Sequence, residues 1–308
     1  MQIIEASTKN IEWEGTIGDP EVFSTILIDI AQLDADPALE LVLSGLRENS
    51  SAQRILIVDG ISQSIQDQFI LSNLSDRVVK GVHVIKTENG SEQLAVISSR
   101  TSSGGDHARL HVYNLATGNQ VWQSEPFLPA APTFYNMESG NFDGDSNTEL
   151  FIAMREIHII FDLGKQTIQS KSGFSRYSAT ALFRRLDNKY FVMSYDDFIN
   201  KLVFFDVITD NRLLELNVDF DEPNAMKQIS SDFMLIADQS RLHIYSPLNN
   251  EIISTSDEIG TANALGQLPA LMGEATYMTG NSTGLWSIQL NNIPFASDGF
   301  ESSLLDMD

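Results

Sequence analysis

The sequence predicts an all-β protein, a β-propeller of about six four-stranded blades. Three observations support this fold class. A short apolar phrase recurs along the chain, its copies stand roughly 40 to 55 residues apart, and turn residues interrupt every apolar run within about ten positions. Helical periodicity is not sustained anywhere, which argues against alternating strands and helices. Seven blades stay an alternative if a degenerate blade lies in the long first unit.

Each copy of the phrase is a β-rich run followed by a polar turn. The first apolar residues of the six copies are Ile55, Leu110, Ile157, Leu202, Leu242 and Leu285. A second β-rich run precedes each phrase, a further run precedes that one in most units, and a short run follows the polar turn. We therefore expect four strands in each unit, the number found in a propeller blade.

The two ends of the chain are expected to meet in one ring. The last unit lacks a fourth strand, whereas the N-terminal run Asn10–Glu14 resembles the fourth-strand run Asn119–Gln123 of the second unit. The N-terminus is therefore predicted to complete the last blade, because closure removes the exposed edges of an open sheet. Residues 1–297 should form this single domain, and residues 298–308 an acidic polar tail or the start of a linker.

Charge and composition argue against several partners and chemistries. The chain has 42 acidic and 19 basic residues, a formal charge of −23, so nucleic acid and anionic membrane surfaces are unfavourable partners. It has no cysteine, which excludes disulfides, thiolate metal sites and cysteine nucleophiles. No apolar run approaches the ~20 residues that span a bilayer, so we expect no membrane insertion.

One loop has the ligand pattern of a calcium site. Oxygen-bearing side chains occupy every second position, and the predicted ligands are the side chains of Asn141, Asp143, Asp145 and Glu149 with the backbone carbonyl of Asn147. Calcium takes six to eight oxygen ligands at about 2.3 to 2.6 Å, which such a loop can supply. The alternative is a polar turn between two strands that holds no ion.

A weaker copy of this pattern lies earlier in the chain. Its positions are Gln32, Asp34, Asp36, Ala38 and Glu40, which keep three carboxylates in the same register. Ala38 is tolerable if that position contributes its backbone oxygen, whereas Gln32 is a neutral and longer first ligand. The corresponding connections of the other units hold too few carboxylates for an ion.

The longer-matching loop resembles the calcium loop of the FG-GAP or VCBS repeats in integrin-alpha-like β-propellers. Gly140–Asp145 and Glu149–Ile152 are the segments that match. The resemblance implies a propeller whose loop-bound calcium is mainly structural, often within a large secreted or surface protein that binds partners. The loop departs from the family pattern at Ser146, where glycine is usual, and at Glu149, where aspartate is common. Neither change removes a ligand.

The expected localisation rests on the two ends of the sequence together with this resemblance. The N-terminal segment lacks the basic and apolar regions of a signal peptide, which taken literally indicates the cytoplasm. The chain nevertheless starts almost inside a strand and ends in a polar acidic segment, as an excised domain would. We therefore expect an extracytoplasmic setting, secreted, periplasmic or at the cell surface, as part of a larger chain.

The sequence gives little support to a catalytic function. His111, His158 and His243 occupy the same position in three copies of the phrase, which indicates a packing role on equivalent strands. No nucleophile elbow, phosphate loop or dinucleotide fingerprint is present. The run Leu115–Trp122 also looks like blade ends of quinoprotein-type propellers, but no pyrroloquinoline site can be matched. Calcium is the only cofactor predicted.

Partner binding is expected on the loop face opposite the calcium loops. The loops at residues 102–108, 124–132 and 217–224 should emerge there, and a protein or glycan is the expected partner. The candidate contact residues are Gly104, Gly105, His107, Phe127 and Phe220. Aromatic side chains at such places supply contact area.

Three functions are weighed. The first is a calcium-binding, non-catalytic binding, adhesion or protein-interaction module, which predicts calcium-dependent stability and no turnover. The second is a polysaccharide-active propeller enzyme of the lyase or glycosidase type, for which Asp219, Asp221 and Glu222 offer carboxylates. The third is a structural scaffold domain, which would expose an apolar patch without a ligand pocket. The sequence favours the first and predicts no oligomeric state.

Overall fold

The described part of the chain is built only from β-strands. The computed structural model describes residues 2–4, 11–14, 27–34, 36, 39–46, 53–71, 74, 77–87, 90–100, 108–127, 133–172, 175–185, 187, 189–258, 264–268, 276–281 and 284–288. Every element in these ranges is a strand. None of them is a helix that could cross a membrane. The all-β prediction is confirmed.

The chain divides into two compact units, residues 1–139 with 162–167 and residues 140–161 with 168–308. In the first unit, β1 (Gln2–Ile4) pairs with β2 (Ile11–Glu14). Two four-stranded sheets of this unit are built in chain order from β3 (Leu27–Ala31), β4 (Glu40–Leu46), β5 (Gln53–Val58) and β6 (Ile65–Ile70), and from β7 (Arg77–Lys86), β8 (Glu92–Arg100), β9 (Ala108–Asn114) and β10 (Gln120–Gln123).

Three further four-stranded sheets and one three-stranded sheet follow. The next sheet consists of β11 (Phe134–Gly140), β12 (Glu149–Met154), β13 (His158–Asp162) and β14 (Thr167–Lys171). The sheets of the second unit are β15 (Tyr177–Arg184), β16 (Tyr190–Asp196), β17 (Lys201–Asp206) and β18 (Arg212–Leu216), then β19 (Ala225–Gln228), β20 (Met234–Ala237), β21 (Leu242–Ser246) and β22 (Glu251–Thr255), then β23 (Ala264–Leu268), β24 (Thr276–Asn281) and β25 (Gly284–Ile288).

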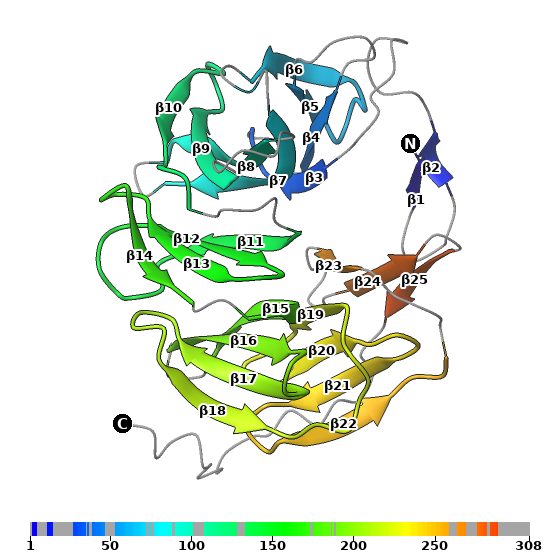
Figure 1. Ribbon diagram of the computed structural model, residues 1–308. Helices are drawn as coiled ribbons and strands as arrows, with labels where there is room; N and C mark the ends of the chain where they lie inside the picture. Colours follow the sequence, from blue (N-terminus) through cyan, green and yellow to red (C-terminus); the bar gives the residue numbers. More distant parts are fainter. Residues whose placement is uncertain are drawn as a thin grey trace. The chain divides into compact units, whose positions relative to one another are not determined.

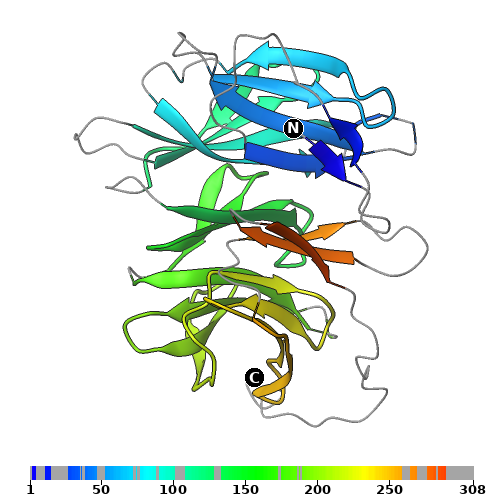
Figure 2. The ribbon, with the colours of Figure 1, turned by 90° about the vertical axis from the view of Figure 1, so that its right-hand side faces the viewer.

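Within each unit, neighbouring sheets meet through their first strands. β3 contacts β7 in the first unit, and β19 contacts both β15 and β23 in the second unit. Figure 1 shows β15 and β19 side by side, and Figure 2 shows β19–β22, coloured yellow to orange, as one twisted sheet. Four-stranded sheets that turn their first strands toward one another are the blades of a propeller.

The repeated phrases are the third strands of the six sheets. They correspond to β5, β9, β13, β17, β21 and β25. All residues of β12 and β13 are buried, whereas most residues of the fourth strands β6 and β14 are exposed. A strand that is covered on both faces needs a continuous apolar run rather than an alternating one, which explains the phrase that recurs in the sequence.

The turn after the third strand repeats as well. Asp206 accepts a hydrogen bond from the backbone N–H of Thr209 at 2.7 Å, and Asp210 follows with a φ of +56°. In the second sheet Gly118 takes the equivalent position with a φ of +66°. Aspartate and asparagine hold such turns through their side chains, and the left-handed backbone favours glycine, asparagine or aspartate.

Each unit has its own apolar core between sheets. Buried residues of the first unit's core include Val42, Ile55, Leu94, Val96 and Tyr113. Those of the second unit include Met193, Phe204, Met234, Ile236 and Tyr245. These residues come mainly from second and third strands, so the middle of each sheet supplies most of the packing.

Ring closure stays a prediction. The pairing that the structure describes for Ile11–Glu14 is with β1, and the last sheet has three strands among the described residues. The seventh blade, the single domain over residues 1–297 and the fourth-strand role of the N-terminus are therefore untested. The predicted tail at residues 298–308 lies outside the described residues.

Candidate functional sites

The predicted calcium loop connects β11 to β12 and gathers three carboxylates. One oxygen each from Asp143, Asp145 and Glu149 lies within 4.8 Å of the other two. Glu149 is fully buried at the start of β12, while the two aspartates are half-buried. Gly144 between them has a φ of +81°, a conformation that glycine adopts at no steric cost. The pattern of alternating acidic residues therefore does converge on one point.

Hydrogen bonds inside this loop hold its shape. The Asn141 side chain donates to the Asp145 carbonyl oxygen and accepts from the Gly144 N–H at 2.7 Å. The Asp145 N–H donates to Asp143 Oδ1 at 2.9 Å, and the Asn147 N–H donates to Asp145 Oδ1 at 2.6 Å. These are the bonds of successive Asx-turns, so the loop is organised by its own side chains.

Two contacts anchor the loop to the rest of the second unit. Glu149 Oε2 accepts from the Phe142 N–H at 2.6 Å, and the Phe142 ring packs on Tyr190 at a centroid distance of 5.1 Å. Gln169, on the fourth strand β14, donates from Nε2 to Asp143 Oδ2 at 2.6 Å. The loop is thus fixed both to the start of β16 in the neighbouring sheet and to the fourth strand of its own sheet.

The earlier predicted loop, residues 32–40 between β3 and β4 (the first loop), repeats the contacts of residues 141–149 (the second loop). Gln32 Nε2 donates to the Asp36 carbonyl oxygen at 2.7 Å, as Asn141 does to Asp145. The Asp36 N–H donates to Asp34 Oδ1 at 2.9 Å, and Gln66 Nε2 of the fourth strand β6 donates to Asp34 Oδ2 at 3.0 Å. Different residue types therefore build the same loop. The predicted position Ala38 lies outside the described residues.

Sequence reasoning missed one acidic member of this first loop. Oxygens of Asp34, Asp36 and Asp59 lie within 4.8 Å of one another, and Asp59 comes from the turn between β5 and β6. The backbone N–H of Ser62 donates to the Asp59 carboxylate. Asp59 is the first residue of the turn that repeats after each third strand. The sequence therefore indicates its role in the turn and gives no sign that it lies close to the loop.

Glu40 provides a test of whether a cation fits the first loop. Glu40 is fully buried, and its Oε2 accepts a hydrogen bond from the Leu33 N–H at 2.5 Å. Oε1 is buried and makes no hydrogen bond within the described residues. Burial raises the pKa of Glu40, the Leu33 N–H lowers it, and the nearby charges of Asp34 and Asp36 raise it further. A cation here would supply the missing partner and offset the clustered charge.

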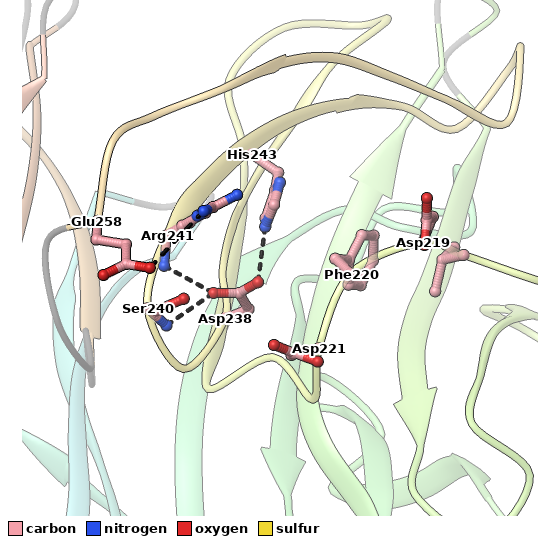
Figure 3. Close-up of a pocket in the computed structure, with 9 residues that line it drawn as sticks. Asp219, Phe220, Asp221, Asp238, Ser240, Arg241, His243 and Glu258 are labelled. Atoms are coloured by element: carbon pink, nitrogen blue, oxygen red, sulfur yellow. Dashed lines mark hydrogen bonds and ion pairs between the residues drawn. The ribbon is translucent and has the colours of Figure 1, made fainter.

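A separate pocket of about 430 Å³ lies in the second unit. It is lined by residues from the β18–β19 connection, from the β20–β21 turn with β21, and from the segment after β22: Val218, Asp219, Phe220, Asp221, Asp238, Ser240, Arg241, His243 and Glu258. Figure 3 shows the acidic side chains and the Phe220 ring around it. Phe220, which the sequence predicts as a partner contact, is one of the residues that line this pocket.

A buried aspartate–histidine pair forms part of the pocket lining. Asp238 Oδ2 and His243 Nε2 lie 2.8 Å apart, and Asp238 Oδ1 accepts from the N–H groups of Ser240 and Arg241 at 2.8 and 2.7 Å. Burial alone would raise the pKa of Asp238, but these hydrogen bonds hold the pKa below its usual value. Asp238 and His243 therefore have hydrogen-bond partners within the chain, which fix their side chains in the wall of the pocket.

The Phe220 ring rests on three other aromatic rings. It stacks on His243 at a centroid distance of 5.6 Å, meets Tyr245 edge-on at 6.0 Å and lies 6.2 Å from Tyr195. Aromatic pairs at these separations are favourable beyond their buried area. Phe220 is therefore held in place by aromatic residues of its own chain.

The other predicted contact residues differ in their outcome. Phe127 is only 4% exposed, so its ring offers little area to a partner. Gly104, Gly105 and His107 lie outside the described residues. The prediction made for the repeated histidines is confirmed, because His111, His158 and His243 are all buried. His158 bonds Asp210 at 2.8 Å, and His111 bonds Ser98 at 2.8 Å.

A polar cluster on three first strands was not predicted. His83 on β7 contacts Asp29 Oδ2 on β3 through Nδ1 at 3.1 Å and Ser139 Oγ on β11 through Nε2 at 3.0 Å. Burial would raise the pKa of Asp29, but His83 and the Val84 and Ile30 N–H groups together lower it. The three residues are far apart in the chain, and no local pattern links them. The cluster ties consecutive first strands together in the first unit.

Comparisons with known proteins support the fold. No protein-family model and no curated protein matches the sequence, so the FG-GAP resemblance stays a prediction. Among solved structures, BBS1N in complex with ARL6DN aligns with a TM-score of 0.60 at 12% identity, over 87% of this chain and 80% of that one. The Dos1 propeller aligns with a TM-score of 0.57 at 11% identity, over 82% and 65%. BamB from Moraxella catarrhalis gives 0.50 at 16% identity, over 83% and 69%. The chain has a β-propeller fold.

Proposed function

We propose that this chain is a calcium-binding β-propeller that acts as a non-catalytic protein-interaction module of a larger secreted or surface protein. The observation that supports calcium most directly is the repeated loop, in which different sequences build one hydrogen-bonded arrangement around clustered carboxylates. The observation that supports partner binding is the polar pocket around Phe220. A propeller of similar fold, BBS1N, is bound to ARL6DN in its structure.

The ion would be held by oxygens that the loops already bring together. Asp143, Asp145 and Glu149 would hold it in one loop, and Asp34, Asp36 and Asp59 in the other, where the buried Glu40 Oε1 also lacks a hydrogen-bond partner. Calcium suits this donor set because it prefers carboxylate and carbonyl oxygens and tolerates irregular geometry. Its charge would relieve the repulsion among the carboxylates, so its expected role is structural.

Calorimetric titration with calcium, with magnesium and with chelator tests this role. We expect calcium to bind and to raise the unfolding temperature, and Asp143→Asn and Asp34→Asn each to remove one binding event. Asp257→Asn serves as the control, since this aspartate is exposed and belongs to neither loop. Absence of calcium heat in the parent protein, or equal heat in all variants, would make both loops plain turns.

The enzyme alternative has one observation in its favour. Asp219 and Asp221 line the same pocket as Asp238 and His243, so carboxylates do converge there. However, Asp238 is engaged by two backbone N–H groups and by His243, which leaves the exposed aspartates without a buried acid partner. Release of reducing or unsaturated sugar ends from acidic and neutral polysaccharides by the purified protein would support the enzyme instead.

A further inference from the structure

We infer that the pocket around Phe220 and the neighbouring turn of the β16–β17 hairpin form one docking surface for a basic segment of a protein partner. An arginine side chain enters the pocket beside Phe220, and an apolar neighbour of that arginine covers Phe198. This inference rests on the proposed interaction function and names the chemistry of the partner.

The segments that make this surface emerge at the same end of their sheets. Successive antiparallel strands reverse direction, so the turn from second to third strand and the connection from fourth strand to the next sheet share one end. The β16–β17 turn at residues 197–200, the β18–β19 connection at 217–224 and the β20–β21 turn at 238–241 are segments of these two kinds. The acidic loops connect first to second strands and lie at the other end of their sheets.

Contacts join the turn to the connection. The Asp197 N–H donates to the Arg176 carbonyl oxygen at 2.8 Å, which sets the start of the turn. Burial raises the pKa of Asp197, and the adjoining Glu222 carboxyl of the connection raises it further. The Phe220 ring of the connection lies 6.2 Å from the ring of Tyr195, two residues before the turn, so the two segments pack beside one another.

The charge of the pocket selects a cation. Asp219, Asp221, Asp238 and Glu258 line it against one guanidinium, that of Arg241, which lies 3.7 Å from Glu258. Asp238 is occupied by its own chain, whereas Asp219 and Asp221 are exposed on either side of Phe220 in the sequence (Figure 3). The formal charge of −23 over the whole chain adds to the attraction of a basic partner and repels anionic ones.

The aromatic ring favours arginine over lysine. A cation over an aromatic face is attracted by the ring, and the planar guanidinium can stack on the ring while it donates to carboxylates on either side. Phe220 is held by its aromatic neighbours, so little side-chain entropy is lost when a partner binds. Arginine and aromatic residues are also the residue types most enriched among interface hot spots.

Exposed apolar side chains supply the second half of the surface. Phe198 is 74% exposed and Ile199 is 39% exposed, both in the β16–β17 turn. An exposed aromatic beside an acidic pocket matches a partner segment in which an apolar residue stands next to an arginine. A nucleic acid or an anionic lipid surface fits neither the charge nor this pairing.

Fluorescence anisotropy with three labelled peptides tests the inference. The probe is a short peptide with one central arginine flanked by leucines, compared with the same peptide containing citrulline or lysine. We expect the arginine peptide to bind at least about tenfold more tightly than the citrulline peptide, with lysine between them, and binding to weaken as salt rises. Equal affinity of the arginine and citrulline peptides would overturn the inference.

Substitutions locate the peptide on the protein. Phe220→Leu, Asp219→Asn with Asp221→Asn, and Phe198→Ala should each weaken the arginine peptide by about three- to tenfold. Ile208→Ala is the matched control, because Ile208 is 44% exposed in the turn at the other end of the same sheet as Phe198. Weakening by Ile208→Ala equal to that by Phe198→Ala would place the peptide elsewhere and overturn the surface.

Calcium titration of the same samples separates this inference from the proposed function. An intact calcium response together with no discrimination among peptides would overturn only the docking surface. A missing calcium response would overturn the calcium role while leaving the peptide comparison valid, since the pocket contains none of the loop residues.

Discussion

The two acidic loops reach one arrangement from different sequences. Both bond their first side chain to the carbonyl oxygen four residues on, and both bond a buried glutamate to the N–H seven residues earlier. In each, an apolar residue follows the first position: Leu33 packs against the core of one unit, and Phe142 against Tyr190 in the other. The comparison shows that the spacing of polar, apolar and buried acidic positions sets this loop, rather than the identity of its first residue.

The loops differ in enclosure and in where their third carboxylate originates. The glutamine that holds the first loop, Gln66, is exposed at 3.0 Å from Asp34, whereas Gln169 is half-buried at 2.6 Å from Asp143. Asp59 adds an acidic group to the first loop from a separate turn. We therefore expect the second loop to be the more rigid site and the first loop to be the more charged one.

The largest expected effect comes from removing the buried glutamate of the second loop. Glu149→Ala leaves the buried Phe142 N–H without its acceptor and should lower the free energy of unfolding by about 3 kcal/mol in chelator. Glu149→Gln keeps an acceptor oxygen and should cost clearly less, while it still weakens calcium binding. Urea unfolding of both variants measures the difference. Equal losses would show that the Phe142 bond is not what holds the loop.

A somewhat smaller effect is expected from calcium itself, and it should differ between the loops. At a hundredfold excess over the dissociation constant, one site adds about 2.7 kcal/mol to the free energy of unfolding. Asp145→Asn should remove the tighter binding event and Asp36→Asn the weaker one, because the second loop is better enclosed. Titration calorimetry of the two variants gives the order. The reverse order would mean that the added charge of Asp59 outweighs enclosure.

A third prediction concerns the glutamines on the fourth strands. Gln169→Leu removes a half-buried hydrogen bond to a carboxylate and should cost about 1 kcal/mol of stability, whereas Gln66→Leu at the exposed bond should cost about half of that or less. Both should weaken calcium binding, since an unheld aspartate must be ordered by the ion. Thermal unfolding with and without calcium tests it, with Gln68→Leu as an exposed control on β6.

The smallest expected effect is a pH dependence of the first loop. Glu40 has a raised pKa in the folded protein, so the folded state holds its proton more tightly than the unfolded chain. Without calcium, this contribution to stability is therefore present at low pH and is lost as pH rises from about 4.3, the value of an unperturbed glutamate, toward the raised pKa. Glu40→Gln should flatten this part of the profile in chelator. An unchanged profile would assign the slope to other groups.

Much of the fold was predictable because its strands and turns recur as short local patterns in the sequence. Third strands such as Lys201–Phe205 are continuous apolar runs bounded by a recognisable turn, and the loop pattern from Asn141 to Glu149 needs only alternate spacing. What could not be predicted depends on strands distant in the chain. Gln169 reaches Asp143 from β14, and Asp59 reaches the first loop from another turn, so neither carries a local signal of its role.

The hydrogen bond from the fourth strand to the acidic loop should affect how readily this protein associates with other copies of itself. β6 and β14 are edge strands of their sheets, and edge strands can pair with another chain. Gln66 and Gln169 join these edge strands by hydrogen bonds to the connection between the first and second strands of the same sheet. If calcium binds these loops as proposed, removing it would weaken this attachment, so a concentrated, calcium-depleted solution should favour strand exchange and self-association over the isolated molecule.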